Sequence, residues 1–178
     1  MRVLGIDPGM RITGYGCVEL TSPSPLVQPR LLEAGVLRFK SKQSVEDRLV
    51  EMHASIAELI AELEPDHVAV EKLYAHYKHP RTAIVMGHAR GVILLAARQA
   101  GKLIAHLPAT EVKKSITGNG HATKQQMQLA VAGQCGLAEP PNPPDVADAI
   151  AIALTAARRL VHQPLTDASA AASPSGPR

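Results

Sequence analysis

The sequence contains few aromatic residues and few cysteines. Aromatic side chains make up 2% of its 178 residues and tryptophan is absent, so a buried core must be built from aliphatic side chains. The two cysteines, Cys17 and Cys135, lie far apart without the spacing of a metal site. This excludes a disulfide framework, and we interpret both as buried small hydrophobic residues.

Long apolar runs are also missing. None approaches the roughly 18 to 20 residues that a membrane-spanning helix needs. The N-terminal run MRVLGIDPGM is interrupted by Asp7 and lacks a cleavage site of small residues, so we interpret it as a strand and expect a cytoplasmic chain with no membrane association.

Composition and length favour one ordered domain. Hydrophobic residues make up 46% and charged residues 20%, which excludes wholesale disorder, and two domains would be cramped in a chain of this size. We assign the domain to residues 1–162 and expect residues 163–178, rich in Ala, Ser and Pro, to form a disordered tail.

Positive charge is concentrated in the middle of the chain. From Lys72 to Lys124 there are nine Lys and Arg residues against one acidic residue, Glu111, a difference of +8. A single lysine in this block is most simply a solvated surface residue. The whole block favours a phosphate-rich partner, because such a field attracts a polyanion by counterion release.

Strand and helix patterns alternate along the sequence. The first three strands carry the turn residues of an antiparallel meander, and the later strand–helix–strand order predicts parallel pairing. The segment 21–30 contains three prolines and is expected to be a surface loop. The predicted strands are residues 2–7, 12–20, 31–39, 67–71 and 102–107, and the predicted helices are residues 45–64, 80–99, 109–116, 123–135 and 145–160. The expected fold is α/β, with a mixed five-stranded sheet flanked by helices.

Four acidic residues occupy positions suited to metal chemistry. Asp7 and Glu71 each end an apolar strand, while Asp145 and Asp148 open the last helix on one face. Each has an ordinary alternative: Asp7 lies in an Asp-Pro-Gly turn, and Asp145 and Asp148 could cap their helix. Together, four carboxylates on three elements could hold two Mg²⁺ ions for phosphodiester hydrolysis.

Five separated segments resemble the RuvC family of Holliday-junction resolvases. They are GIDPGMRITGYG, AVEKLY, GHARGVILLAA, VKKSITGNGHATK and DVADAIAIAL, in family order over about residues 1–160. The resemblance implies an RNase H-like fold and a crossover junction endodeoxyribonuclease of recombination and repair. Such an enzyme acts as a homodimer on opposed strands of a four-way DNA junction and leaves 5′-phosphate ends. The resemblance further implies two Mg²⁺ ions per active site, replaceable by Mn²⁺, and the RuvA–RuvB branch-migration complex as a partner.

The resemblance also assigns residues. Lys113 and Lys124 match two lysines near the active centre, and Tyr74 stands where the family often has a Phe that interacts with unpaired junction bases. The catalytic, metal-binding carboxylates would be Asp7, Glu71, Asp145 and Asp148. From the basic block we add Lys78, Arg81 and Lys114 as DNA contacts. The sequence departs from the family pattern in Tyr rather than Phe at 74, in a longer, His-rich loop at 76–80 and in an apparent insertion at 21–30.

Several alternatives stay open. His106 and His121 could act as general bases, although a structural role is the default for histidine. In the helix at 80–99, Ile84, Gly87, Gly91 and Leu94 could form a dimer interface or could pack in the core.

Competing functions are also possible. An ATPase or sugar kinase of related fold would fit Asp7-Pro8-Gly9, but it needs two lobes and the length supplies one. A non-catalytic junction-binding protein would not require all four acids, and a relative that trims structured RNA is a third possibility.

Overall fold

The computed structural model describes residues 1–22, 24, 27–73 and 80–162. Its centre is a five-stranded sheet in the order β3-β2-β1-β4-β5. The strands are β1 (Arg2–Asp7), β2 (Ile12–Glu19), β3 (Arg30–Arg38), β4 (His67–Glu71) and β5 (Leu103–Leu107). β1, β2 and β3 pair antiparallel, whereas β1 with β4 and β4 with β5 pair parallel. The predicted combination of a meander and parallel strands is therefore confirmed.

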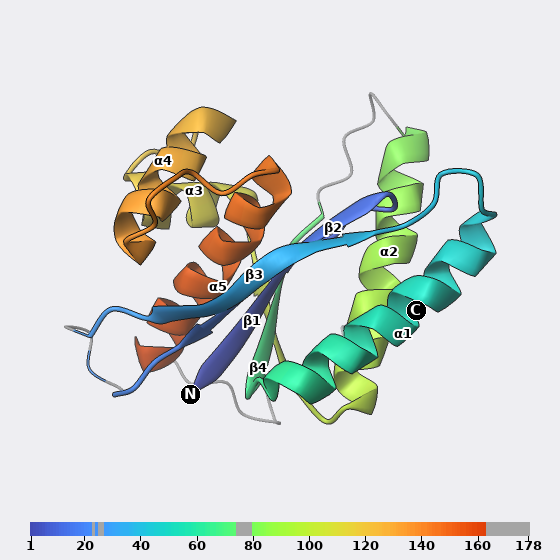
Figure 1. Cartoon of the computed structure of the whole chain (residues 1–178), viewed down its shortest axis with the longest axis horizontal. Helices are drawn as coiled ribbons and strands as arrows, with labels where there is room; N and C mark the ends of the chain where they lie inside the picture. The colour runs from blue at the N-terminus through green and yellow to red at the C-terminus, as the bar shows by residue number, and fades with distance from the viewer. Residues whose placement is uncertain (23, 25–26, 74–79, 163–178) are drawn as a thin grey trace, which may run out of the picture.

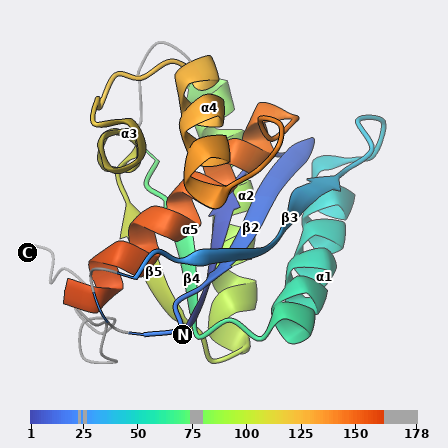
Figure 2. The same ribbon diagram turned by 60° about the vertical axis from the view of Figure 1, so that its left-hand side comes forward.

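Helices cover both faces of the sheet. One face is covered by α5 with α3 and α4 behind it, and the other by α1 and α2 (Figure 1; Figure 2). The helices are α1 (Val45–Leu63), α2 (Pro80–Gln99), α3 (Ala109–Thr117), α4 (Lys124–Cys135) and α5 (Pro144–His162). In the described part of the chain, no helix is both long and apolar enough to span a membrane. The tail predicted at 163–178 lies outside the described residues.

Two hydrophobic cores result from this layering. One lies between the sheet and α5 and includes Val18, Ala69 and Leu107. The other lies between the sheet and α1 and α2, and it includes Ile6 and Cys17. Cys17 is buried as expected, whereas Cys135 is only half-buried. Successive residues of a strand enter opposite cores because side chains alternate between the two faces.

Three glycines let α5 lie unusually close to the sheet. A Cβ atom at Gly5 would overlap the carbonyl oxygen of Ala149, and one at Gly14 would overlap the carbonyl oxygen of Asp145. A Cβ atom at Gly16 would lie 2.9 Å from the side chain of Ile150. Alanines dominate the buried positions of α5, and this explains how a core with so few aromatic residues is filled. The backbones meet where larger side chains would hold them apart.

Substitution of Gly5 tests this close approach. We expect Gly5→Ala to lower the free energy of unfolding by at least about 2 kcal/mol, because either the helix or β1 must move. The matched control is Gly133→Ala in α4, where nothing lies within 4 Å of the added Cβ; there, alanine should raise stability by about 0.5–1 kcal/mol. Urea denaturation measures both. Equal stabilities for Gly5→Ala and the wild type would contradict the close-packing argument.

Candidate active site

Two carboxylates lie side by side at one edge of the sheet. β1 and β4 are parallel neighbours with Ile6 aligned to Val70, so Asp7 and Glu71 are the next residues at the ends of the two strands. Gly5 and Ala69 face α5. Because side chains alternate along a strand, Asp7 and Glu71 face α5 as well.

The first turn of α5 brings two more carboxylates to the same place. Gly14, which pairs with Asp7 across β1 and β2, lies against the backbone of Asp145. Asp148 follows three residues later and is therefore on the same face of the helix. The glycine contact thus fixes the start of α5 beside the end of β1.

The structure does not support helix capping as the role of Asp145 and Asp148. α5 begins at Pro144, so Asp145 lies inside the first turn instead of preceding it. Within the described residues, neither side chain takes part in a hydrogen bond, and the same holds for Asp7. Four half-buried carboxylates therefore lie at this edge of the sheet, and three of them accept no hydrogen bond from a described residue.

Burial and mutual repulsion both raise the pKa values of these groups. Burial raises the pKa of Asp7 to about 8, and the negative charges of Asp148, Glu71 and Asp145 add to the effect in that order. Burial also raises the pKa of Glu71, helped by the charge of Asp148. The pKa of Asp148 is raised by burial and then by Asp145. The four acids predicted from separate segments therefore form one electrostatic site.

Two lysines act on this site from α3 and α4. The charge of Lys124 lowers the pKa of Asp7 and of Asp148, and the charge of Lys113 lowers that of Glu71 and of Asp148. Thr123 and Gln126 form a capping box that fixes the start of α4 at Lys124. Lys113 is half-buried and Lys124 exposed. Both lysines therefore influence carboxylates of the same site, and their role in it stays a prediction.

The structure describes the other predicted DNA contacts only in part. Lys114 is exposed on α3. Tyr74 and Lys78 lie outside the described residues, and Arg81 is described only as a position in the first turn of α2.

The two histidines considered as general bases do not join the carboxylates. His106 lies between Ala105 and Leu107, which face α5, so it points to the opposite face. There, its Nδ1 is 2.7 Å from Nη2 of Arg90. His121 is exposed, and its backbone N–H donates to the side chain of Asn119 at 2.9 Å.

Arg90 is a residue that the sequence interpretation treated only as part of the basic block. Its Nε donates to the carbonyl oxygen of Glu71 at 3.0 Å while Nη2 approaches His106. It thus connects α2 to the end of the strand that carries Glu71. In the sequence, only its position next to the buried Ala89 indicated a structural role for Arg90. Its contact with Glu71 depends on tertiary structure, which the sequence pattern does not contain.

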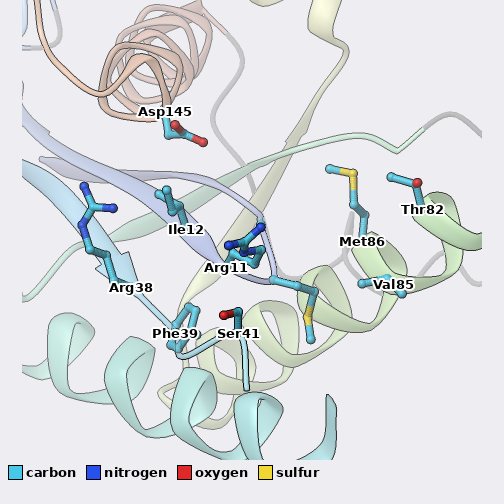
Figure 3. A pocket seen from close by; sticks show the side chains of 11 residues that line it. Arg11, Ile12, Arg38, Phe39, Ser41, Thr82, Val85, Met86 and Asp145 are labelled. Carbon is cyan, nitrogen blue, oxygen red and sulfur yellow. The ribbon is translucent and has the colours of Figure 1, made fainter. Parts of the chain in front are cut away.

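A groove opens beside Asp145. It has a volume of about 710 Å³ and is lined by the β1–β2 turn, the end of β3 and the first turns of α2. Figure 3 shows Asp145 above this space, with Arg11 in the β1–β2 turn and Arg38 at the end of β3 below it, and Thr82 and Met86 on α2. The sequence interpretation did not connect these arginines with the acids.

The donor set suits a divalent cation that prefers oxygen. Carboxylates are the protein ligands of Mg²⁺ and Mn²⁺, and a cation would offset the repulsion that adds to the effect of burial on the pKa of Asp7. No three His, Cys, Asp or Glu side chains of the described ranges lie close enough together to hold an ion as they stand. The side chains would therefore have to turn toward a shared ion.

Comparison with known proteins shows the family to which this chain is similar. The family model for crossover junction endodeoxyribonuclease RuvC matches residues 3–156. The enzyme of that name from Rhodopirellula baltica is 47% identical over 152 residues, which are 85% of this chain and 83% of the relative. Thermus thermophilus RuvC, solved in complex with a Holliday junction substrate, superposes with a TM-score of 0.81 at 34% identity, covering 91% of this chain and 96% of that one. The yeast mitochondrial resolvase Ydc2 shares the fold, with a TM-score of 0.63 at 14% identity, over 90% of this chain and 80% of that one.

The pKa of Asp7 predicts how stability depends on pH when metal is removed. An unfolded chain releases this proton near pH 4, whereas the folded protein retains it up to about pH 8. Stability should therefore fall as the pH rises between these values, with the full penalty above pH 8. We expect Asp7→Asn to match the wild type near pH 4 and to melt at a higher temperature at pH 8.5. Thermal denaturation in EDTA measures this, with the exposed Glu58→Gln on α1 as control; parallel pH profiles for wild type and Asp7→Asn would contradict it.

Proposed function

This chain belongs to the RuvC family of crossover junction endodeoxyribonucleases, and we propose that its carboxylate site cleaves four-way DNA junctions. The observation that carries the proposal is that Asp7, Glu71, Asp145 and Asp148 lie at one sheet edge and influence one another electrostatically, with Lys113 and Lys124 acting on the same groups. The fold is RNase H-like. The similarity to a RuvC solved with a Holliday junction covers nearly the whole chain and supports the choice of substrate.

The family is one of metal-dependent nucleases, and two Mg²⁺ ions are our proposal for this site. Asp7, Glu71, Asp145 and Asp148 would hold them, because all four supply oxygen donors and none is occupied by a hydrogen bond among the described residues. When bound, the ions supply Lewis-acid stabilisation and a nucleophile from water for phosphodiester hydrolysis; Mn²⁺ is expected to substitute. The products would carry 5′-phosphate ends.

Lys113 and Lys124 have a separate task in this proposal. Each places a positive charge near two of the carboxylates, where a scissile phosphate would sit. Their ammonium groups would bind the phosphate and stabilise the negative charge that grows on its oxygens during attack. The half-buried setting of Lys113 makes this charge more effective than one in bulk water.

The competing functions fit less well. A kinase or ATPase of related fold needs a second lobe, and the described residues form one sheet with two helical layers. A binding protein without catalysis has no use for four mutually repelling carboxylates. Cleavage of structured RNA is distinguished by substrate choice in the experiment below.

The outer face of α2 supports assembly as a homodimer. Ile84 and Leu95 are 59% and 52% exposed, and no atom lies within 4 Å of the Cβ position at Gly87 or Gly91. Leu94, which we assigned to this face from the sequence, packs on the core instead, and Leu95 takes its place. A second copy is the proposed occupant, since a junction offers two equivalent scissile phosphates and a twofold pair of sites matches them.

Three further assignments follow from family membership and from the basic block at residues 72–124. The RuvA–RuvB branch-migration complex is the proposed protein partner. A cytoplasmic location is inferred from a chromosomal DNA substrate in a chain with bacterial relatives. Tyr74, Lys78, Arg81 and Lys114 remain proposed DNA contacts.

Asp7→Asn tests the proposed reaction. We expect junction cleavage to fall at least about 1,000-fold, because the central carboxylate charge is lost, while junction affinity stays within about threefold. Single-turnover cleavage with Mg²⁺ and parallel binding measurements compare a four-way DNA junction with duplex DNA, a DNA–RNA hybrid and structured RNA. Glu58→Gln serves as the control variant. Near-wild-type cleavage by Asp7→Asn, or preferential cutting of RNA, would refute the assignment.

The dimer is tested on α2. Replacing both Ile84 and Leu95 by Glu should shift the protein from dimer to monomer in sedimentation velocity at micromolar concentration, because four charges would be buried at a twofold interface. Val50→Glu on α1 is the control, since Val50 is 72% exposed and lies on another helix. A monomeric wild type, with or without junction DNA, would rule out this interface.

A further inference from the structure

Two arginines lie near the carboxylates at the end of the sheet formed by the β1–β2 turn and β3. Arg11 lies in the turn between β1 and β2, and Arg38 ends β3. Their backbones are connected, because the N–H of Phe39 donates to the carbonyl oxygen of Arg11 at 3.0 Å and Arg38 pairs with Ile12. The two side chains therefore start from neighbouring, well-fixed points at one end of the sheet.

Arg38 lies on the catalytic face of the sheet. Gly14 faces α5 and is aligned with Val36 of β3, so the alternation of side chains places Arg38 on that face too. Figure 3 shows the Arg38 side chain extending toward the end of α5 that carries Asp145. Both arginines and Asp145 line the same groove.

Neither arginine has a structural task within the protein. Both are exposed, and neither side chain forms a hydrogen bond or an ion pair with another residue that the structure describes. Other arginines at the ends of strands do have partners: Arg2 and Arg30 both pair with Glu19. The two free guanidinium groups give the groove a local excess of positive charge over Asp145.

The chemistry of the groove suits a sugar–phosphate backbone. A guanidinium presents a planar fork of donors that matches two phosphate oxygens. Ser41 and Thr82 add hydroxyl groups to the lining, and such groups commonly donate to phosphates in DNA complexes. A groove of about 710 Å³ that is lined by Asp145 has room for a DNA strand leaving the site.

We propose that Arg11 and Arg38 bind backbone phosphates of the cleaved DNA strand, next to the scissile phosphate on the β3 side of the carboxylates. This rests on the proposed nuclease function. In the sheet order, Arg38 belongs to β3, Asp7 to β1 and Glu71 to β4. A DNA strand crossing this edge from β3 toward β4 would meet Arg38 before it meets Asp7 and Glu71.

Salt-dependent junction binding in EDTA tests the proposal. The Arg11→Gln/Arg38→Gln double variant should lower the slope of log affinity against log salt by about one unit per lost phosphate contact. Arg11→Lys/Arg38→Lys should keep most of the slope, because the charges remain. The matched control is Arg30→Gln, at the opposite end of β3, where Glu19 retains Arg2 as a partner. Circular dichroism and melting temperature check that each variant is folded.

A scan with single methylphosphonate linkages then locates the contact. Removing the charge of a contacted phosphate should weaken wild-type binding and have much less effect on the Gln double variant, because the two changes remove one interaction. Equal salt slopes for wild type and the double variant, or additive losses at every phosphate, would overturn this inference alone. Additive losses combined with an altered cleavage sequence would assign the arginines to base edges and would overturn it as well. A wild type that neither binds nor cuts junctions would remove the proposed function, and with it this inference.

Discussion

The close contact between α5 and the glycines of β1 and β2 is the constraint on which the rest of the site depends. Gly5 and Gly14 leave room for the helix backbone itself, so the first turn of α5 is held beside the end of β1. A larger side chain at either position would move Asp145 and Asp148 away from Asp7. The same contact explains why alanine fills α5. Core packing and the assembly of the carboxylates are thus one feature of the fold.

The acidic and basic side chains at this edge of the sheet have opposite effects on the site. Burial, together with repulsion from the neighbouring carboxylates, raises the pKa of Asp7 to about 8, which costs folding stability in the metal-free protein. Lysines from α3 and α4 reduce this repulsion only in part. The site is therefore suited to ligands that carry positive charge, and its arrangement does not serve the stability of the chain alone. This is the usual relation between strained charge clusters and function.

Much of this could be predicted from the sequence. Apolar runs and helical periodicity located every strand and helix to within about two residues, because both cores require uninterrupted apolar faces. Asp7 and Glu71 stood out because each follows a buried strand. The choice between capping and catalysis for Asp145 could not be made, since it depends on where α5 begins. We predicted Leu94 on the outer face of α2, but Leu95 lies there instead. Adjacent helix positions differ by about 100°, and only packing decides the boundary of the buried face. The positions of Arg90, Arg11 and Arg38 near the acidic residues could not be predicted. They depend on the register of strands distant in sequence, which no local pattern contains.

The bond from Arg90 to the carbonyl oxygen of Glu71 has a consequence for the geometry of the pair of active sites. α2 presents Ile84 and Leu95 outward, while Arg90, from the same helix, holds the end of β4. In the proposed dimer, a single rigid helix in each subunit would separate the twofold axis from the carboxylate edge. The span between the two reaction centres would then be set by helix and sheet geometry, with little contribution from loops. Such a pair of sites would accept only DNA whose two target phosphates lie at that separation. The distance fixed by the protein backbone would then select a branched substrate.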